Sequence, residues 1–281
     1  MTRKEALRQG VLQLKEADSD TPYLDAAVLL SEALHISKEQ LYVSLPDQID
    51  DAPLSRFREF IRNRQAGNPV SYIIGRKEFF GLEFTVDKRV LVPRPDTEVL
   101  VEAVMDKIKA MEKPPDVLDI CTGTGCIPIA LKYYLPYIQV FASDISAEVE
   151  DVYNENALRH LAAIPPFFVS NLFDNIPKKF DIITANPPYL NSEEIRNMRF
   201  INWPEPEIAL DGGDDGLNLY RLIIKKAPEK LRKNGFLVME GAYWQLKPLK
   251  ELMKQAGYSD IVIREDLGGR DRVIIGTTPI S

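Results

Sequence analysis

The clearest indication of the fold class is the segment Val117-Leu-Asp-Ile-Cys-Thr-Gly-Thr-Gly125. It reads as a short apolar strand that runs directly into a glycine-rich turn, after which a helical pattern begins. Glycines at such a turn let the backbone approach a ligand closely, and the following helix offers free N–H groups. A tight turn without a ligand explains the glycines equally well, and the spacing differs from the G-x-G-x-x-G pattern of dinucleotide-binding folds.

Outward from this segment, strand and helix patterns alternate from residue 96 onward. Strands are predicted at 117–120, 139–143, 167–169, 180–185, 235–239, 261–263 and 272–276. Strands separated by helices indicate an α/β fold with a Rossmann-like, doubly wound and mostly parallel sheet. The last two strands are joined only by a polar turn, which predicts an antiparallel pair at the edge of the sheet.

The first 75 residues have a different, purely helical pattern. Thr2 with Glu5 and Ser37 with Gln40 have the spacing of capping boxes, and a helix over 51–66 ends before Gly67. The β-rich stretch 78–86 is centred on a glycine and predicts a hairpin. We therefore expect an N-terminal helical domain at 1–75, a β-hairpin linker at 76–95 and a separate α/β domain at 96–281.

Composition excludes several classes of protein. The chain has 281 residues with 35 Lys and Arg against 42 Asp and Glu, so it lacks the basic excess of a large nucleic-acid surface. No apolar run approaches the roughly 18 residues of a membrane helix, and the start of the chain lacks the apolar region of a signal peptide. Two cysteines and two histidines argue against a disulfide framework or a metal site. A cytoplasmic protein that binds neither membrane nor nucleic acid is expected.

Asp144 stands at the end of the second predicted strand, about twenty residues after the glycine turn. A carboxylate there can accept both hydrogen bonds of a ribose diol, which indicates a cofactor that contains a nucleoside. The alternative is that Asp144 is simply the N-cap of the helix that follows, and the two roles are compatible.

The strongest motif is Asn186-Pro-Pro-Tyr189, which follows the strand at 180–185. Two prolines end a strand without any ligand, but that explains neither Asn186 nor Tyr189. A planar –NH₂ group can donate one hydrogen to the Asn186 side chain and the other to the Pro187 carbonyl, while Tyr189 supplies a flat face. The motif therefore predicts a site that orients an amide or aromatic amine.

Together, these motifs resemble those of S-adenosylmethionine-dependent amino-methyltransferases. Three further stretches narrow the resemblance: Leu91-Val-Pro-Arg-Pro-Asp-Thr-Glu98, Trp203-Pro-Glu-Pro-Glu-Ile-Ala-Leu-Asp-Gly212 and Asp266-Leu-Gly-Gly-Arg-Asp-Arg272. Over essentially its full length the chain is similar to the peptide chain release factor glutamine methyltransferases, the PrmC/HemK family.

The resemblance implies that a methyl group passes from S-adenosyl-L-methionine to the amide nitrogen of the glutamine in the Gly-Gly-Gln loop of release factors 1 and 2, leaving S-adenosyl-L-homocysteine and needing no metal. It implies that the glutamine amide is held by Asn186, Pro187, Pro188 and Tyr189, of which Asn186, Pro187 and Tyr189 are catalytic. It also implies a cofactor site formed by Arg94, Thr97, Asp119, Cys121, Thr122, Gly123, Thr124, Gly125, Asp144, Asn171, Leu172 and Asn186.

Some alternatives remain open. The segment from Pro93 to Thr97 is as compatible with a rigid interdomain linker as with a wall of the cofactor pocket. Cys121 stands where many relatives have glycine and Asn171 where an acidic residue is frequent, which puts cofactor affinity in question. The leading alternative function is methylation of an adenine or cytosine amine in nucleic acid, and the acidic composition argues against it. A cofactor-binding scaffold without catalysis is a further alternative.

Overall fold

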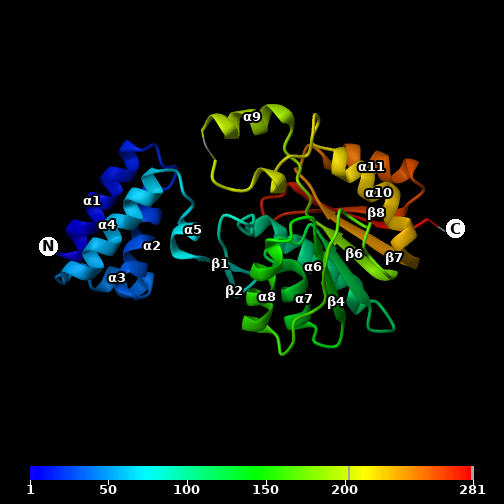
Figure 1. The fold of residues 1–281 in the computed structure, drawn as a ribbon, viewed down its shortest axis with the longest axis horizontal. Coiled ribbons are helices and arrows are strands. Elements are labelled where there is room, and N and C mark those ends of the chain that lie inside the picture. Colours follow the sequence, from blue (N-terminus) through cyan, green and yellow to red (C-terminus); the bar gives the residue numbers. More distant parts are fainter. Residues whose placement is uncertain (202, 280–281) are drawn as a thin grey trace. The chain divides into compact units, whose positions relative to one another are not determined.

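The computed structural model describes residues 1–201 and 203–279, and their contacts group into two compact units. The first unit consists of Met1–Arg76 with Ile201, Trp203 and Pro204. The second contains the described residues from Lys77 onward apart from that short segment (Figure 1). In the described residues, no helix combines the length and the apolar character needed to cross a membrane.

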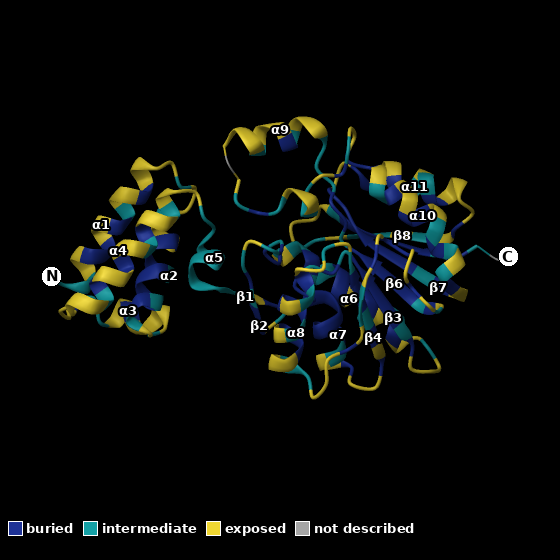
Figure 2. Ribbon diagram, viewed as in Figure 1, coloured by how far each residue is buried: buried dark blue, intermediate teal, exposed yellow. Residues whose placement is uncertain are grey.

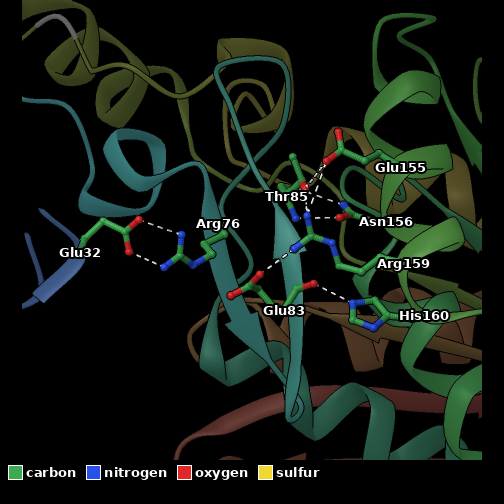
Figure 3. A network of polar contacts seen from close by, with 8 residues as sticks. All are labelled: Glu32, Arg76, Glu83, Thr85, Glu155, Asn156, Arg159 and His160. Atoms are coloured by element: carbon green, nitrogen blue, oxygen red, sulfur yellow. Dashed lines mark hydrogen bonds and ion pairs between the residues drawn. The ribbon is translucent and has the colours of Figure 1, made fainter. Parts of the chain in front are cut away.

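The first unit is a small helical bundle, as the sequence predicts. Its helices are α1 (Arg3–Glu16), α2 (Pro22–Leu34), α3 (Lys38–Val43), α4 (Asp51–Gln65) and α5 (Val70–Ile74), the last of which the sequence patterns did not reveal. Both predicted capping boxes are present, at the start of α1 and of α3. Leu14, Leu30, Phe57 and Ile61 belong to its buried core. Arg76 forms an ion pair with Glu32 of α2 (Figure 3).

A β-hairpin follows, formed by β1 (Arg76–Phe79) and β2 (Leu82–Thr85). Phe80 and Gly81 at its turn both have positive φ, 52° and 73°, as a tight two-residue hairpin turn requires. Phe79, Leu82 and Phe84 belong to the core of the second unit. The stretch predicted as a linker is thus built largely into the second unit.

The side chain of Asn156 in α8 (Val149–His160) forms hydrogen bonds with both the hairpin and the glycine turn. Its Oδ1 accepts from the Thr85 amide at 2.7 Å, and its Nδ2 donates to the carbonyls of Thr85 at 3.1 Å and Thr124 at 3.0 Å. Figure 3 shows the Thr85 contacts beside those of Arg159 with Glu83 and of His160 with the Glu83 carbonyl. One buried carboxamide therefore joins two separate segments of the second unit.

We expect Asn156→Ala to destabilise the protein markedly. The substitution leaves up to three backbone groups without their partner, one in a buried and two in partly buried hydrogen bonds, at about 1–3 kcal/mol for each unsatisfied buried group. Urea denaturation followed by circular dichroism should give a loss of roughly 3 kcal/mol in the free energy of unfolding. The matched control is Asn154→Ala on the same helix, since the side chain of that half-buried residue forms no hydrogen bond with another described residue. Equal stability of the two variants would contradict the prediction.

The second unit is built on a sheet with the strand order β5-β4-β3-β6-β7-β9-β8. Its strands are β3 (Asp116–Ile120), β4 (Gln139–Asp144), β5 (Phe167–Val169), β6 (Phe180–Ala185), β7 (Leu231–Glu240), β8 (Ser259–Glu265) and β9 (Asp271–Thr277). The first five are parallel, and β9 is antiparallel to both β7 and β8. The predicted antiparallel pair is confirmed, but the final strand lies between β7 and β8, an insertion that the linear order of the patterns does not reveal.

Helices cover both faces of this sheet (Figure 1). On one face, α6 (Glu98–Lys109), α7 (Cys126–Tyr134) and α8 share a core with Val117, and on the other α10 (Asn218–Lys230) and α11 (Leu246–Gln255) share a core with Leu118. Successive residues of β3 thus point to opposite faces, and the sheet strands are largely buried (Figure 2). The remaining helices are the short η1 (Pro95–Thr97) and η2 (Glu207–Ala209) and the largely exposed α9 (Ser192–Phe200).

The strand order reverses at β3, because β4 and β5 lie on one side of it and β6 and β7 on the other. In open α/β sheets, ligands bind outside the carboxyl ends of the strands at such a switch point. The glycine turn, Asp144 and the Asn186 motif all follow the carboxyl ends of β3, β4 and β6. The topology therefore gathers the predicted site residues along one edge.

Candidate active site

The glycine turn between β3 and α7 has three residues with positive φ: Cys121 at 57°, Gly123 at 52° and Gly125 at 78°. A Cβ atom at Gly125 would lie 2.4 Å from the Tyr153 ring, so this glycine is required for packing. A Cβ atom at Gly123 would meet nothing within 4 Å, so this glycine borders open space. Cys121 adopts a left-handed backbone conformation that residues other than glycine rarely occupy. It also lines a cavity.

Asp144 at the end of β4 holds the turn from the other side. Its Oδ2 accepts from the Gly123 amide at 3.0 Å and its Oδ1 from the Ser146 amide at 3.1 Å. The N-cap interpretation is wrong, because α8 begins only at Val149 and its N-cap is Glu148. Burial raises the pKa of the Asp144 carboxyl, and the amides of Gly123 and Ser146 act in the opposite direction.

A cavity of about 570 Å³ opens beside this turn. That is within the range of sites that bind small organic ligands. Seven of the predicted residues lie in its wall: Cys121, Gly123, Asp144, Asn171, Leu172, Asn186 and Pro188. The sequence patterns did not indicate the rest of the wall, which includes Arg89, Val90, Leu91, Ile145, Val149, Ile208 and Leu219. Carboxylate and amide groups thus share one mainly apolar space.

Four further predicted residues, Asp119, Thr122, Thr124 and Gly125, support the cavity from outside its wall. Asp119 is completely buried, and its Oδ1 accepts from the Thr184 hydroxyl at 2.6 Å, while its Oδ2 has no partner among the described residues. Burial raises the pKa of Asp119 to about 7. Thr122 is joined to β4 through its amide, which donates to the Ser143 carbonyl at 3.1 Å.

The Asn186 motif leaves β6 with its asparagine facing the cavity. Asn186 Nδ2 donates to the hydroxyl of Thr97 at 3.2 Å. Pro187 and Tyr189 are not in the cavity wall, although Pro187 is buried and Tyr189 half-buried. The Tyr189 carbonyl accepts from Gln245 Nε2 at 3.0 Å, which fixes the end of the motif.

Arg94 and Thr97 are also placed outside the wall. Arg94 pairs with the buried carboxylate of Glu205, which in turn accepts from the Val92 amide at 3.0 Å. Thr97 is buried against Asn186. The Pro93–Thr97 segment is therefore anchored within the second unit and supports the site through Asn186.

Three polar residues around the site were not predicted from the sequence to belong to it: Thr184, Glu240 and Gln245. Glu240 is buried at the end of β7, with a pKa that burial raises to about 7. An acidic residue directly after the apolar run 235–239 was the available signal, since the same pattern identified Asp144. Thr184 lies inside a strand and Gln245 in a loop, and neither carries such a signal.

The described residues contain no group of three or more His, Cys, Asp or Glu side chains that could hold a metal ion. The sheet, with its antiparallel β9, has the class I methyltransferase fold, and the cavity lies at the carboxyl ends of β3, β4 and β6. The catalytic domain of hMettl16, solved with the MAT2A 3'UTR hairpin 6, has this fold: its TM-score is 0.58 at 17% identity, covering 72% of this chain and 77% of that one.

Sequence comparison gives the family. Residues 5–75 match the PrmC N-terminal domain and residues 95–202 the methyltransferase small domain. The release factor glutamine methyltransferase of Moorella thermoacetica is 36% identical over 278 residues, which is 98% of each chain. That of Vibrio cholerae is 36% identical over 283 residues, covering 98% of this chain and 96% of its own. The chain belongs to the release factor glutamine methyltransferase family.

Proposed function

We propose that this protein transfers the methyl group of S-adenosyl-L-methionine to the side-chain amide nitrogen of the glutamine in the Gly-Gly-Gln loop of peptide chain release factors 1 and 2, leaving S-adenosyl-L-homocysteine. The observation that carries the proposal is that Asn186 shares one cavity with Asp144 and the glycine turn. A methyl acceptor held at Asn186 and a donor held at Asp144 would therefore meet in one space. The reaction would take place in the cytoplasm, where release factors act.

The residues present suit S-adenosyl-L-methionine. Gly123 leaves open space for the methionine part of the ligand, and the apolar side chains of Val149 and Leu172 suit an adenine ring. The Asp144 carboxylate would accept the ribose hydroxyls while it keeps its bonds to the Gly123 and Ser146 amides. The bound cofactor supplies a methyl group made electrophilic by the adjacent sulfonium.

The chain's own contribution is to orient a weak nucleophile. An amide nitrogen attacks poorly because its lone pair is delocalised into the carbonyl. Acceptance of its two hydrogens by Asn186 Oδ1 and the Pro187 carbonyl would fix the nitrogen and favour its pyramidalisation. With S-adenosyl-L-methionine held at the glycine turn and Asp144, the cofactor would supply its methyl group to this nitrogen, which would give up one proton to solvent. Positioning and electrostatics account for the catalysis, without a dedicated base.

The helical unit would dock the release factor. The match of residues 5–75 to the PrmC N-terminal domain supports this assignment. The exposed face of α4 carries Arg56, Arg58 and Arg62, which suits an acidic surface on a partner. Catalysis would belong to the second unit, which contains the whole cavity wall.

The test combines the purified protein with methyl-labelled S-adenosyl-L-methionine and, separately, unmodified release factor, RNA and DNA. We expect label on the release factor only, and its loss when the glutamine of the Gly-Gly-Gln loop is replaced. Label on nucleic acid alone would overturn the proposal in favour of a nucleic-acid amine. Absence of transfer to every substrate, with the cofactor still bound in calorimetry, would indicate a binding scaffold.

A further inference from the structure

Glu240 lies beside Asn186 at the same edge of the sheet. Ala185, the last residue of β6, pairs with Met239 of β7, so Asn186 directly after β6 lies next to Glu240 at the end of β7. The Glu240 side chain is only 1% exposed, and its Oε2 has no hydrogen-bond partner among the described residues. A buried carboxylate is costly to retain, so its position next to the substrate-binding asparagine calls for an explanation.

The groups around Glu240 come from several elements. Thr97 of η1 and Arg272 of β9 favour its charged form, as does Asn186, whereas burial and Asp96 oppose it. Arg272 Nη2 pairs with Asp96 at 2.8 Å and Asp266 at 3.2 Å, while its buried Nε has no hydrogen-bond partner among the described residues. Tyr189 and Tyr220 also face this region, and burial raises the pKa of both phenols, so they are neutral near pH 7. Thr97 and Asn186 are thus the polar neighbours that can respond to Glu240 directly.

We propose that Glu240 is a positioning residue that, together with Thr97, fixes which end of the Asn186 carboxamide faces the substrate. The inference rests on the proposed function. The two ends of a carboxamide have nearly the same shape but opposite hydrogen-bonding character. In the structure Asn186 Nδ2 donates to Thr97 Oγ1, which leaves Oδ1 as the acceptor for a substrate amide.

A rotated Asn186 would turn its carbonyl oxygen toward the Thr97 hydroxyl and the Glu240 carboxylate. Above pH 7 the Glu240 carboxyl is ionised. An ionised carboxylate only accepts hydrogen bonds, so it repels that oxygen and favours the observed orientation. It also takes the hydroxyl hydrogen that Thr97 would otherwise offer to the rotated carbonyl. Rotation of the Asn186 carboxamide would bring its –NH₂ group against the –NH₂ group of the substrate amide, and two donors cannot form a hydrogen bond. Glu240 therefore selects the orientation that can bind a primary amide.

Glu240→Gln, measured at pH 8, tests this role, because glutamine keeps the shape but offers an –NH₂ donor that can bind the rotated Asn186 carbonyl and so favours the unproductive orientation. We expect kcat toward the release factor to fall about ten- to a hundredfold, in line with the effect of small misplacements at reacting groups. The Kd for S-adenosyl-L-methionine should remain unchanged. The Tm should stay equal or rise, since a buried ionisable group is removed. A residue with only a structural role would lower activity and Tm together.

Three further measurements make the result specific. Thr97→Ser keeps the hydroxyl and should retain activity, whereas Thr97→Val should resemble Glu240→Gln. The matched control Glu265→Gln makes the same chemical change at the exposed end of β8 and should leave kcat unchanged. The side-chain amide resonance of Asn186, identified by its absence in Asn186→Ala, should move in Glu240→Gln without any substrate.

Two outcomes would overturn the inference. A folded Glu240→Gln enzyme with wild-type kcat and an unmoved Asn186 resonance would contradict the positioning role while leaving the proposed function intact. A wild-type protein that methylates no release factor would remove the proposed function and, with it, the inference.

Discussion

Asn186→Ala should abolish most of the methyl transfer while leaving cofactor binding nearly intact. The substitution removes the side-chain oxygen that would accept one hydrogen of the substrate amide, and it leaves the Asp144 contacts untouched. Loss of a single preorganised polar group at a reacting centre typically costs about 10²–10³ in kcat. We therefore expect kcat to fall at least a hundredfold, with the Kd for S-adenosyl-L-methionine within about twofold of wild type.

Single-turnover transfer to unmodified release factor measures the first quantity, and isothermal titration the second. Asn154→Ala serves as control, since Asn154 lies on α8 outside the cavity wall. Near-normal turnover by a folded Asn186→Ala enzyme would remove Asn186 from the catalytic site. A parallel loss of cofactor affinity would instead mean that Asn186 mainly forms part of the cofactor pocket.

Asp144→Ala should have the opposite pattern, with weak cofactor binding as the primary defect. The variant loses the proposed acceptor for the ribose hydroxyls and the anchor of the Gly123 amide at 3.0 Å. Hydrogen bonds to charged groups contribute about 1.5–3 kcal/mol each, and each 1.4 kcal/mol corresponds to about tenfold in affinity. We expect the Kd for S-adenosyl-L-methionine to rise about a hundredfold, and saturating cofactor to restore much of kcat.

Asp144→Asn separates the proposed ribose contact from the support of the glycine turn. The asparagine side chain can still accept one hydrogen bond through its oxygen, but it presents an –NH₂ donor to the second of the backbone amides of Gly123 and Ser146. The variant's affinity should fall between those of wild type and Asp144→Ala. Asp174→Asn is the matched control, as Asp174 follows β5 and, within the described part of the chain, its exposed carboxylate pairs with Lys226 alone. Unchanged affinity in Asp144→Ala would reduce Asp144 to a support for the turn.

The sheet, and the placement of the site at the carboxyl ends of its strands, could be predicted because both depend on local sequence patterns. Short apolar runs such as 180–185 coincide with observed strands, and capping boxes such as that of Thr2 with Glu5 gave the start of helices. Parallel strands place their carboxyl ends together, so residues after different strands meet without any knowledge of loops. The glycine turn, Asp144 and Asn186 were assigned to one site on that basis, whereas Asn171 was implied by the family resemblance. Cys121, Asp144, Asn171 and Asn186 line one cavity.

The support behind the site was less predictable, because it depends on pairings between distant segments. Thr97 contacts Asn186 across 89 positions of sequence, and Asn156 reaches Thr85 across 71. No local pattern encodes such pairs. Nor does the chain order reveal that β9 lies between β7 and β8, which brings Arg272 toward Glu240.

The two buried carboxyls also bear on how the fold responds to acidity. Asp119 and Glu240 both have pKa values raised to about 7 by burial, above their ordinary values of 3.8 and 4.5. Between those ordinary values and pH 7, the native state keeps protons that the unfolded chain has released, so folding is coupled to proton uptake. The contribution of these groups to stability is complete below their unfolded pKa values and is lost as the pH rises through 7. Below about pH 7, the Asp119 and Glu240 carboxyls thus hold protons in the folded protein that the unfolded chain would release.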